Sequence, residues 1–357
     1  MWNKLKRPWV FFKRKVKDQQ ADISADLQQG SPLLKLLLGL AALFMLVLVG
    51  VGMYWSSEPD DFNVSEAAAQ AAAGNNHEVV TGTTTTATLI TVASTLLDKP
   101  GGFLTNDITP PSLWLDNMPN WEYGVLTQVR DLSRSLHERF SRSQSQSTED
   151  RDLGLAKTRF HFDNDSWAFP ASESVYREGI EYLQAYLTRL GDEDKTDAQF
   201  FTRADNLNYW FGTVETNLGS LSQRLSASVG QRRLNTDLAG APAAERSTKV
   251  PKEELVKTPW DEIDDVFYEA RGSAWALAHL LRAIEIDFGD VLDNKNARVS
   301  LQQIIRELDA TQETIYSPMI LNGTGFGFVA NHSLVMASYI SRANAGIIDL
   351  RELLSQG

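Results

Sequence analysis

The sequence predicts an all-α protein with one N-terminal transmembrane helix followed by an exported domain built as an antiparallel helical bundle. Two observations support this fold class. Residues 36–55 are uncharged and mostly apolar, which is the length that a helix needs to cross a bilayer. After residue 80, apolar residues recur at steps of three and four along most of the chain, as on one face of a helix. The only strand that the pattern suggests is short, at 158–162.

Residues 1–32 form a basic tail that we expect on the cytoplasmic side. The first 55 residues contain eight Lys and Arg but three Asp, whereas the formal net charge of the whole chain is −12. Apolar residues in the tail recur at helical steps, at Trp2, Leu5, Trp9, Phe12 and Val16. This spacing favours a helix that lies on anionic lipid. A basic tail that only sets the topology is the alternative.

Residues 33–55 are predicted to span the membrane. Ser31 and Pro32 suit a helix start, Lys35 can extend to the headgroups, and Tyr54-Trp55 suit the opposite interface. A signal peptide would have a shorter apolar region, and a buried core helix would have a polar face. Basic residues precede the span and acidic ones follow it, so the positive-inside rule puts the N-terminus in the cytoplasm. We therefore expect a single-pass inner-membrane protein with a periplasmic C-terminal domain.

The exported part is predicted to begin with a tether at 56–78, which could shorten through a helix in its alanine run. A periplasmic helical domain follows at 79–357. The stretch 235–257 is either a boundary between two bundles or, as we favour, a long loop within one. The helices expected in the domain are 83–98, 125–140, 180–190, 207–225, 258–288, 301–315 and 334–354. The first is rich in β-branched residues, which leaves a strand possible there.

Composition excludes several classes of function. The chain has no Cys, which rules out disulfides, thiolate nucleophiles and iron–sulfur clusters. The acidic exported part would repel phosphate backbones, so we expect no nucleic-acid partner. The five His show no paired metal-ligand spacing, and no nucleophile motif is present. We therefore expect no metal or other cofactor, and the sequence leans away from an enzyme.

The stretch 98–121 combines turn residues with large apolar ones, DKPGGFLTNDITPPSLWLDNMPNW. A flexible linker would not carry so many apolar side chains, so we predict an ordered loop packed on the bundle. It is either a cap on one end of the bundle or part of a binding surface. On the second interpretation, the candidate binding residues in the loop and the following helix are Asn106, Asp107, Trp114, Asp116, Asn117, Trp121 and Arg130.

The same stretch carries a resemblance to a known family. PGGFLTNDITPP, followed by LDNMPNWEYGVLTQVRDLSR, resembles an uncharacterised proteobacterial family of single-span membrane proteins, domain of unknown function 2333. The resemblance extends over most of the chain after the tether. It implies an inner-membrane protein and no particular activity, so no catalytic roles are carried over.

Two functions follow as hypotheses. The first is a non-enzymatic membrane protein whose exported domain binds or scaffolds a protein of the cell envelope, with the lipid bilayer as its other partner. The alternative is a cell-envelope enzyme or ligand-binding protein that acts on peptidoglycan, glycan or lipid. In that case a carboxylate in the 98–121 loop or near 161–165 would transfer the proton. The sequence does not indicate an oligomeric state.

Overall fold

The apolar run near the N-terminus folds as helix α2, Pro32–Trp55. The computed structural model describes residues 32–75, 77–143, 149–192, 194, 196–234, 253–317, 319–324 and 327–356. The chain divides into two units, 1–54 and 55–357, and we call the second unit the body. Within the described residues, α2 is the one helix long and apolar enough to cross a membrane, by length and composition. The helix predicted in the basic tail lies outside the described residues.

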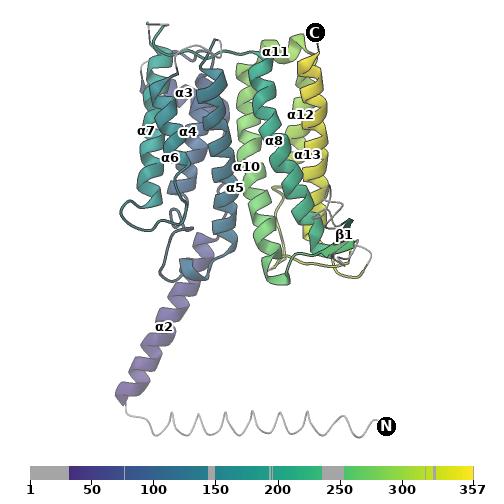
Figure 1. The fold of residues 1–357 in the computed structure, drawn as a ribbon. Helices are drawn as coiled ribbons and strands as arrows, with labels where there is room; N and C mark the ends of the chain where they lie inside the picture. The colour runs from purple at the N-terminus through teal and green to yellow at the C-terminus, as the bar shows by residue number, and fades with distance from the viewer. Residues whose placement is uncertain are drawn as a thin grey trace, which may run out of the picture. The chain divides into compact units, whose positions relative to one another are not determined.

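The body is helical almost throughout its described part (Figure 1), which confirms the all-α prediction. Its α-helices are α3 (Val64–Gly74), α4 (Thr83–Asp98), α5 (Asn117–Ser135), α6 (Arg151–Phe160), α7 (Ser172–Gly191), α8 (Ala204–Ser226), α10 (Ile263–Asp287), α11 (Gly289–Asn294), α12 (Arg298–Ala310) and α13 (His332–Ser355). A π-helical turn, Leu136–Phe140, extends α5. Two short strands, β1 (Gln231–Leu234) and β2 (Glu253–Val256), pair antiparallel with Gln231 opposite Val256.

Helices α5 and α10 form the centre of the body and run parallel to each other. The Asn120 side chain bonds Asp265 at the start of α10, and eight residues further along α5 Gln128 bonds Ser273. Two glycines allow the backbones to touch. A Cβ on Gly124 would lie 2.1 Å from the Glu269 carbonyl oxygen, and one on Gly272 would lie 2.1 Å from that of Trp121. The sequence did not predict that α5 and α10 pair, because the two helices are not consecutive along the chain.

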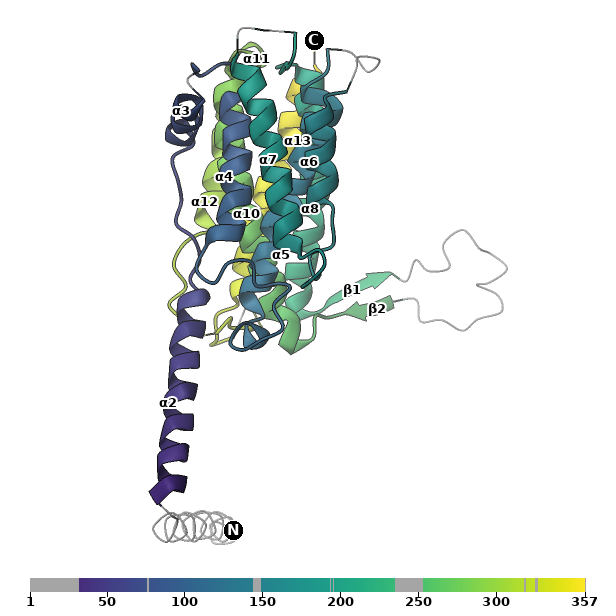
Figure 2. The ribbon, with the colours of Figure 1, turned by 90° about the vertical axis from the view of Figure 1, so that its left-hand side faces the viewer.

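The other helices flank this pair on two sides. Helices α3, α4, α6 and α7 lie on one side, and α8, α12 and α13 lie on the other (Figures 1 and 2). Helix α10 packs against α4, α5, α12 and α13, and its middle is buried on nearly every face. Helices before and after the 235–257 stretch share one core, because α5 packs on α10 and α8 packs on α13. The largest fully buried side chains include Trp121, Trp210, Tyr176, Tyr186, Phe140 and Phe160.

One carboxylate joins two helix termini that lie far apart in sequence. Asp287, at the end of α10, accepts hydrogen bonds from the backbone N–H groups of Gly82 and Thr85 at the start of α4. It also accepts one from the Thr85 hydroxyl, at 2.7 Å. Burial raises the pKa of Asp287, and these donors act in the opposite direction. A negative charge at this point also suits the positive end of the α4 dipole.

Three stretches differ from the sequence-based expectation. The strand predicted at 158–162 is wrong, because 158–160 are the last turn of α6, whose buried face is Leu153, Ala156 and Phe160. The predicted tether, 56–78, belongs to the body over its described residues: α3 buries Val64, Ala68 and Ala72. The strands β1 and β2 flank residues 235–252, which are not described. Most side chains in these strands are polar, so the strands lack the alternating apolar pattern by which a strand is predicted.

Candidate functional site

The 98–121 loop is ordered around a buried ion pair. The Lys99 ammonium lies 2.6 Å from the Glu122 carboxylate, and both side chains are inaccessible to solvent. Glu122 also accepts hydrogen bonds from the backbone N–H groups of Leu104 and Thr105 and from the Thr105 hydroxyl. Burial raises the pKa of Glu122, and Lys99 lowers it. The pair fastens the first half of the loop to the start of α5.

Asn106 and Asp107 face the start of α7. The buried Asn106 amide donates to the Ser166 carbonyl oxygen and to the Glu173 carboxylate, both at 2.7 Å. Burial raises the pKa of Asp107, which a hydrogen bond with Ser112 partly offsets. Asn106 therefore joins the loop to the α6–α7 connection, which is a structural role.

The start of α5 contains three of the candidate residues, Asp116, Asn117 and Trp121. Asp116 is its N-cap residue, and its carboxylate accepts the Asn117 N–H at 2.9 Å. Trp121 is fully buried and packs against Trp275 of α10, with ring centroids 5.3 Å apart. Trp114, by contrast, points to solvent and is 55% exposed.

Arg130 holds the end of α6 in place. Its guanidinium donates to the carbonyl oxygens of Phe160 and Phe162, at 2.7 and 2.8 Å. Arg130 thus satisfies carbonyls at a helix C-terminus, where a cation is favoured. The seven candidate residues are spread over the start of α7, the start and middle of α5 and the core. None of them lines either of the two cavities described next.

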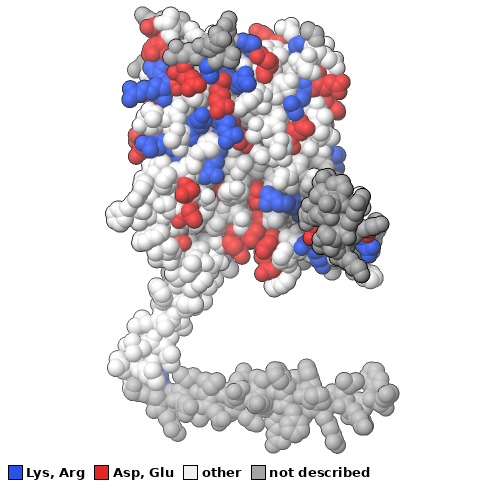
Figure 3. Space-filling view, in the orientation of Figure 1, with Lys and Arg blue, Asp and Glu red and all other residues white. Residues whose placement is uncertain are grey.

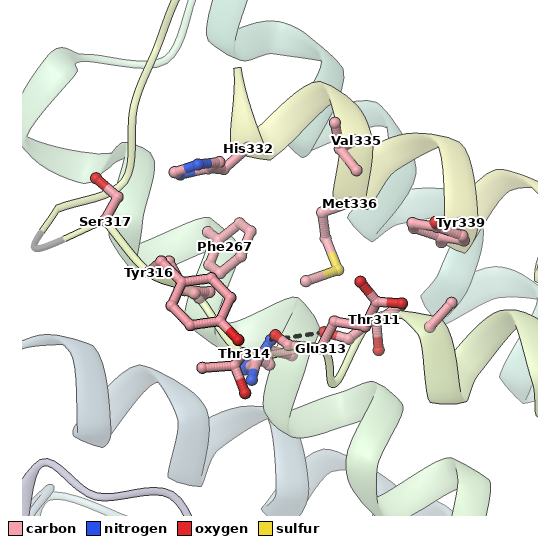
Figure 4. Close-up of a pocket in the computed structure, with 13 residues that line it drawn as sticks. Phe267, Thr311, Glu313, Thr314, Tyr316, Ser317, His332, Val335, Met336 and Tyr339 are labelled. Atoms are coloured by element: carbon pink, nitrogen blue, oxygen red, sulfur yellow. Dashed lines mark hydrogen bonds between the residues drawn. The ribbon is translucent and has the colours of Figure 1, made fainter. Parts of the chain in front are cut away.

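The clearest cavity lies between α10, α13 and the residues that follow α12 (Figure 4). It has a volume of about 330 Å³. Its apolar lining comes from Phe267, Ile315, Tyr316, Val335, Met336 and Tyr339. Thr311, Glu313, Thr314, Ser317 and His332 add polar groups. The His332 Nδ1 accepts the Leu321 N–H at 3.1 Å, which fixes the imidazole at the start of α13.

A second cavity, of about 530 Å³, adjoins the first and shares Arg271, Thr314 and Ile315 with it. Residues 57–61, which follow α2 in the chain, form much of its wall, together with Tyr268, Trp275 and Gln312. Asp60 and Asp61 are exposed there, and Glu58 is half-buried. The linkage of residues 57–61 to the α12–α13 connection was not foreseen from the sequence.

Arg271 lies between the two cavities and lines both of them. Its Nε lies 2.7 Å from both carboxylate oxygens of Glu58. Its two terminal nitrogens donate to the carbonyl oxygens of Thr311, Gln312 and Glu313, at 2.7, 3.1 and 3.0 Å. Arg271 is 5% exposed, so its charge is balanced internally by Glu58 and by the α12 C-terminus.

His279, two turns further along α10, holds the same N-terminal segment. The ring of Phe62 stacks on the imidazole at a centroid distance of 4.2 Å. The Phe62 N–H donates to His279 Nε2 at 3.1 Å, and Nδ1 lies 2.8 Å from the Trp275 carbonyl oxygen. Because a carbonyl only accepts, Nδ1 carries the proton and the imidazole is neutral. Burial lowers the pKa of His279, which agrees with that assignment.

The charges left over around the two cavities are negative. Arg271 and Glu58 neutralise each other, whereas Asp60, Asp61 and Glu313 face solvent at the cavity walls. Groups of three or more His, Asp and Glu that could hold a metal are not found among the described residues. The arrangement can therefore receive an apolar side chain beside a cationic group. The sequence signal for it was Arg271 itself, a single cation in an apolar stretch of α10.

The family of the chain can now be stated. A family model described as an uncharacterised protein conserved in bacteria, domain of unknown function 2333, matches residues 28–357. The chain belongs to this family. The match spans α2 and all described elements of the body, and it includes both cavities and the 98–121 loop. No curated protein and no solved structure matches the chain.

Proposed function

We propose that the protein is a single-pass inner-membrane protein whose body lies in the periplasm and binds a protein partner of the cell envelope at the two cavities around Arg271. Helix α2 supports the anchor, because it has 24 residues, a mean hydropathy of 2.7 and almost no burial. Basic residues before α2 and Glu58, Asp60 and Asp61 after it support a cytoplasmic N-terminus.

The observation that carries the binding proposal is the arrangement at Arg271. One buried guanidinium holds both the segment that follows the anchor, through Glu58, and the α12–α13 connection, through three carbonyl oxygens. The apolar cavity opens directly beside this point. A ligand there would contact the segment that leads to the anchor and the main bundle at the same time.

The partner is a protein segment that places an aromatic or aliphatic side chain next to a Lys or Arg. The apolar side chain would fill the space lined by Phe267, Ile315 and Met336. The cation would lie near Glu313 or Asp60, which, among the described residues, are not paired with an Arg as Glu58 is. The net charge of −12 on the whole chain favours a basic partner as well.

Site-specific photocrosslinking in cells tests the binding site. A photoreactive amino acid at Val335, which lines the apolar cavity and is 56% exposed, should give a specific protein adduct. The same photoreactive amino acid at position 299 is the matched control and should not give that adduct. Val299 is 76% exposed at the start of α12. Glu313→Lys should abolish the Val335 adduct without changing the thermal stability of the body.

Two results would overturn the proposal. An adduct of equal intensity from Val299, or one that Glu313→Lys leaves unchanged, would show that the cavity does not select the partner. A small molecule that copurifies with the protein and is displaced by Met336→Trp would instead favour the ligand-binding alternative, since about 300 Å³ is enough for a small ligand.

Fusion of alkaline phosphatase to the C-terminus tests the topology, because the enzyme is active only after export.

A further inference from the structure

Two loops at one end of the body expose large apolar side chains to solvent. The first lies between α4 and α5, and the second lies between α6 and α7. The exposed residues are Ile108 (55%), Leu113 (62%), Trp114 (55%), Trp167 (62%) and Phe169 (101%). We call these five residues the apolar loop surface. Scattered apolar residues on a surface need no explanation, but a group of this kind marks a contact site.

Both loops are held in place by polar contacts, so the exposure is not a result of loose chain ends. Asn106 of the first loop donates to the Ser166 carbonyl oxygen of the second, at 2.7 Å. Within the second loop, the Ser166 hydroxyl donates to the Pro170 carbonyl oxygen at 2.8 Å. The buried Lys99–Glu122 pair fixes the start of the first loop. The two loops thus form one ordered surface.

The chain enters the body beside this surface. Trp55, the last residue of the apolar run, packs against the core of the body. A Cβ on Gly101, in the first loop, would lie 2.8 Å from the Trp55 ring, and Gly101 has a φ of +88° that suits a residue without a side chain. If residues 33–55 cross a bilayer, Gly101 of the first loop therefore lies next to the residue at which the chain leaves it.

We infer that the apolar loop surface rests in the interfacial layer of the membrane that α2 spans; this inference depends on the membrane anchor of the proposed function. Trp is enriched at this depth, and Trp, Phe and Leu are the apolar residues by which interfacial segments enter the boundary between headgroups and acyl chains. The anchor also keeps the surface close to the bilayer, so even weak apolar contacts are populated.

The contact is apolar and not electrostatic. The neighbouring exposed charges on the second loop are acidic, at Asp163 and Asp165, and the one Lys of the first loop is buried in its ion pair with Glu122. On the face shown in Figure 3, the lower left of the body, where these loops lie in Figure 1, shows red and white atoms with almost no blue. Attraction to anionic lipid, which requires clustered Lys and Arg, therefore does not drive the contact.

The natural absence of Cys permits a direct test in the full-length protein. Single cysteines at Trp114 and Trp167 are labelled with a polarity-sensitive fluorophore, and the protein is reconstituted in vesicles that contain lipids with a headgroup-level quencher. Val299→Cys, on the opposite end of α10 from these loops, is the exposed control. Leu46→Cys, in the middle of α2, reports on the anchor. Circular dichroism checks that each variant is folded.

We expect blue-shifted, strongly quenched emission at positions 114 and 167, with quenching at least about threefold above that at 299 and unchanged between low and high salt. Quenching at 114 and 167 equal to that at 299, with position 46 protected from aqueous quenchers, would overturn the inference and leave the anchor intact. An unprotected position 46 would overturn the anchor itself. The signals should persist at one chain per nanodisc; their loss would mean that a second copy covers the surface.

Discussion

At the scale of single residues, the 98–121 loop depends on one internal charge pair. Lys99 and Glu122 are both inaccessible to solvent, and the carboxylate also satisfies three other donors in the loop. A buried pair of this kind contributes little compared with an apolar pair of the same shape, but the loss of one partner leaves an unbalanced charge in the core.

We therefore expect Lys99→Met to lower the free energy of unfolding by about 3–5 kcal/mol. Arg177→Met is the matched control, because it removes an ion pair with Asp98 in which both side chains are more than half exposed. The control should cost less than about 1 kcal/mol. Chemical denaturation of the two variants measures the difference. Equal effects would mean that Glu122 reaches water when Lys99 is removed.

A second expectation at this scale concerns His279 and pH. Burial lowers the pKa of this imidazole, whereas in the unfolded chain it takes up a proton near pH 6.5. The folded protein binds fewer protons in that window, so stability should be complete above pH 6.5 and should fall as the pH drops below it. Asp61, Arg282 and Asp309 are the charged groups that influence the site.

His279→Gln tests this assignment, since glutamine can still accept the Phe62 N–H but does not titrate. The difference in the free energy of unfolding between this variant and the natural protein should change between pH 8 and pH 5, in favour of the variant at low pH. A constant difference would show that His279 is as easily protonated in the folded state as in the unfolded one.

At the scale of elements, the close parallel contact between α5 and α10 is the feature that most constrains the fold. Gly124 and Gly272 each face a backbone carbonyl of the other helix at a distance that leaves no room for a Cβ. The two helices then share Trp121 and Trp275 in one buried contact. Any side chain at either glycine must push the helices apart.

Gly272→Ala should accordingly destabilise the body by about 1–3 kcal/mol, through overpacking. Gly219→Ala in α8 is the control, because its Cβ would meet only the Asn344 side chain, at 3.6 Å. In a helix that change should be neutral or stabilising by up to about 1 kcal/mol. Thermal unfolding of both variants gives the comparison. Stabilisation by Gly272→Ala would mean that the two helices are further apart than described.

The same elements show what sequence periodicity could and could not predict. Helices such as α8 and α13 were predictable, because their buried residues recur at steps of three and four. The end of helix α6 was predicted as a strand, because polar and apolar side chains alternate over 159–162. The direction of α5 relative to α10 was not predictable, because no residue pattern records which distant helix a given face meets.

The candidate site was likewise predictable from the sequence only in part. The apolar residues of the 98–121 loop predicted an ordered loop packed on the bundle. Phe103 and Leu104 are buried as expected, whereas Ile108, Leu113 and Trp114 are exposed. The polar candidates act within the fold: Asp116 caps α5 and Arg130 holds the end of α6. The cavities around Arg271 could not be predicted, because Glu58 lies 213 residues away from it in the chain.

At the scale of the whole molecule, the body begins earlier than composition suggested. The sequence predicted a domain from residue 79 onward, but the unit defined by internal contacts starts at Trp55. The residues in between supply Glu58 to Arg271, Phe62 to His279 and the packed face of α3. They are part of the fold, although their composition resembles that of a linker.

Two truncated proteins test this boundary. A chain that starts at residue 55 should unfold in one transition with the stability of the full body. A chain that starts at residue 79 should lose at least about 3 kcal/mol, because Arg271 is left without its carboxylate and a face of α10 is uncovered. Denaturant midpoints of the two proteins decide the question. Equal midpoints would mean that residues 56–78 are dispensable for stability.

The attachment of residues 58–62 to the middle of α10 has a mechanical consequence. If the anchor is pulled while the body is held elsewhere, the load passes through the Glu58–Arg271 and Phe62–His279 contacts before it reaches α3 and α4. Tension would thus act on the most buried helix of the body and would not peel away the N-terminal helices one at a time. Force applied through α2 would therefore act first on the wall of the two cavities.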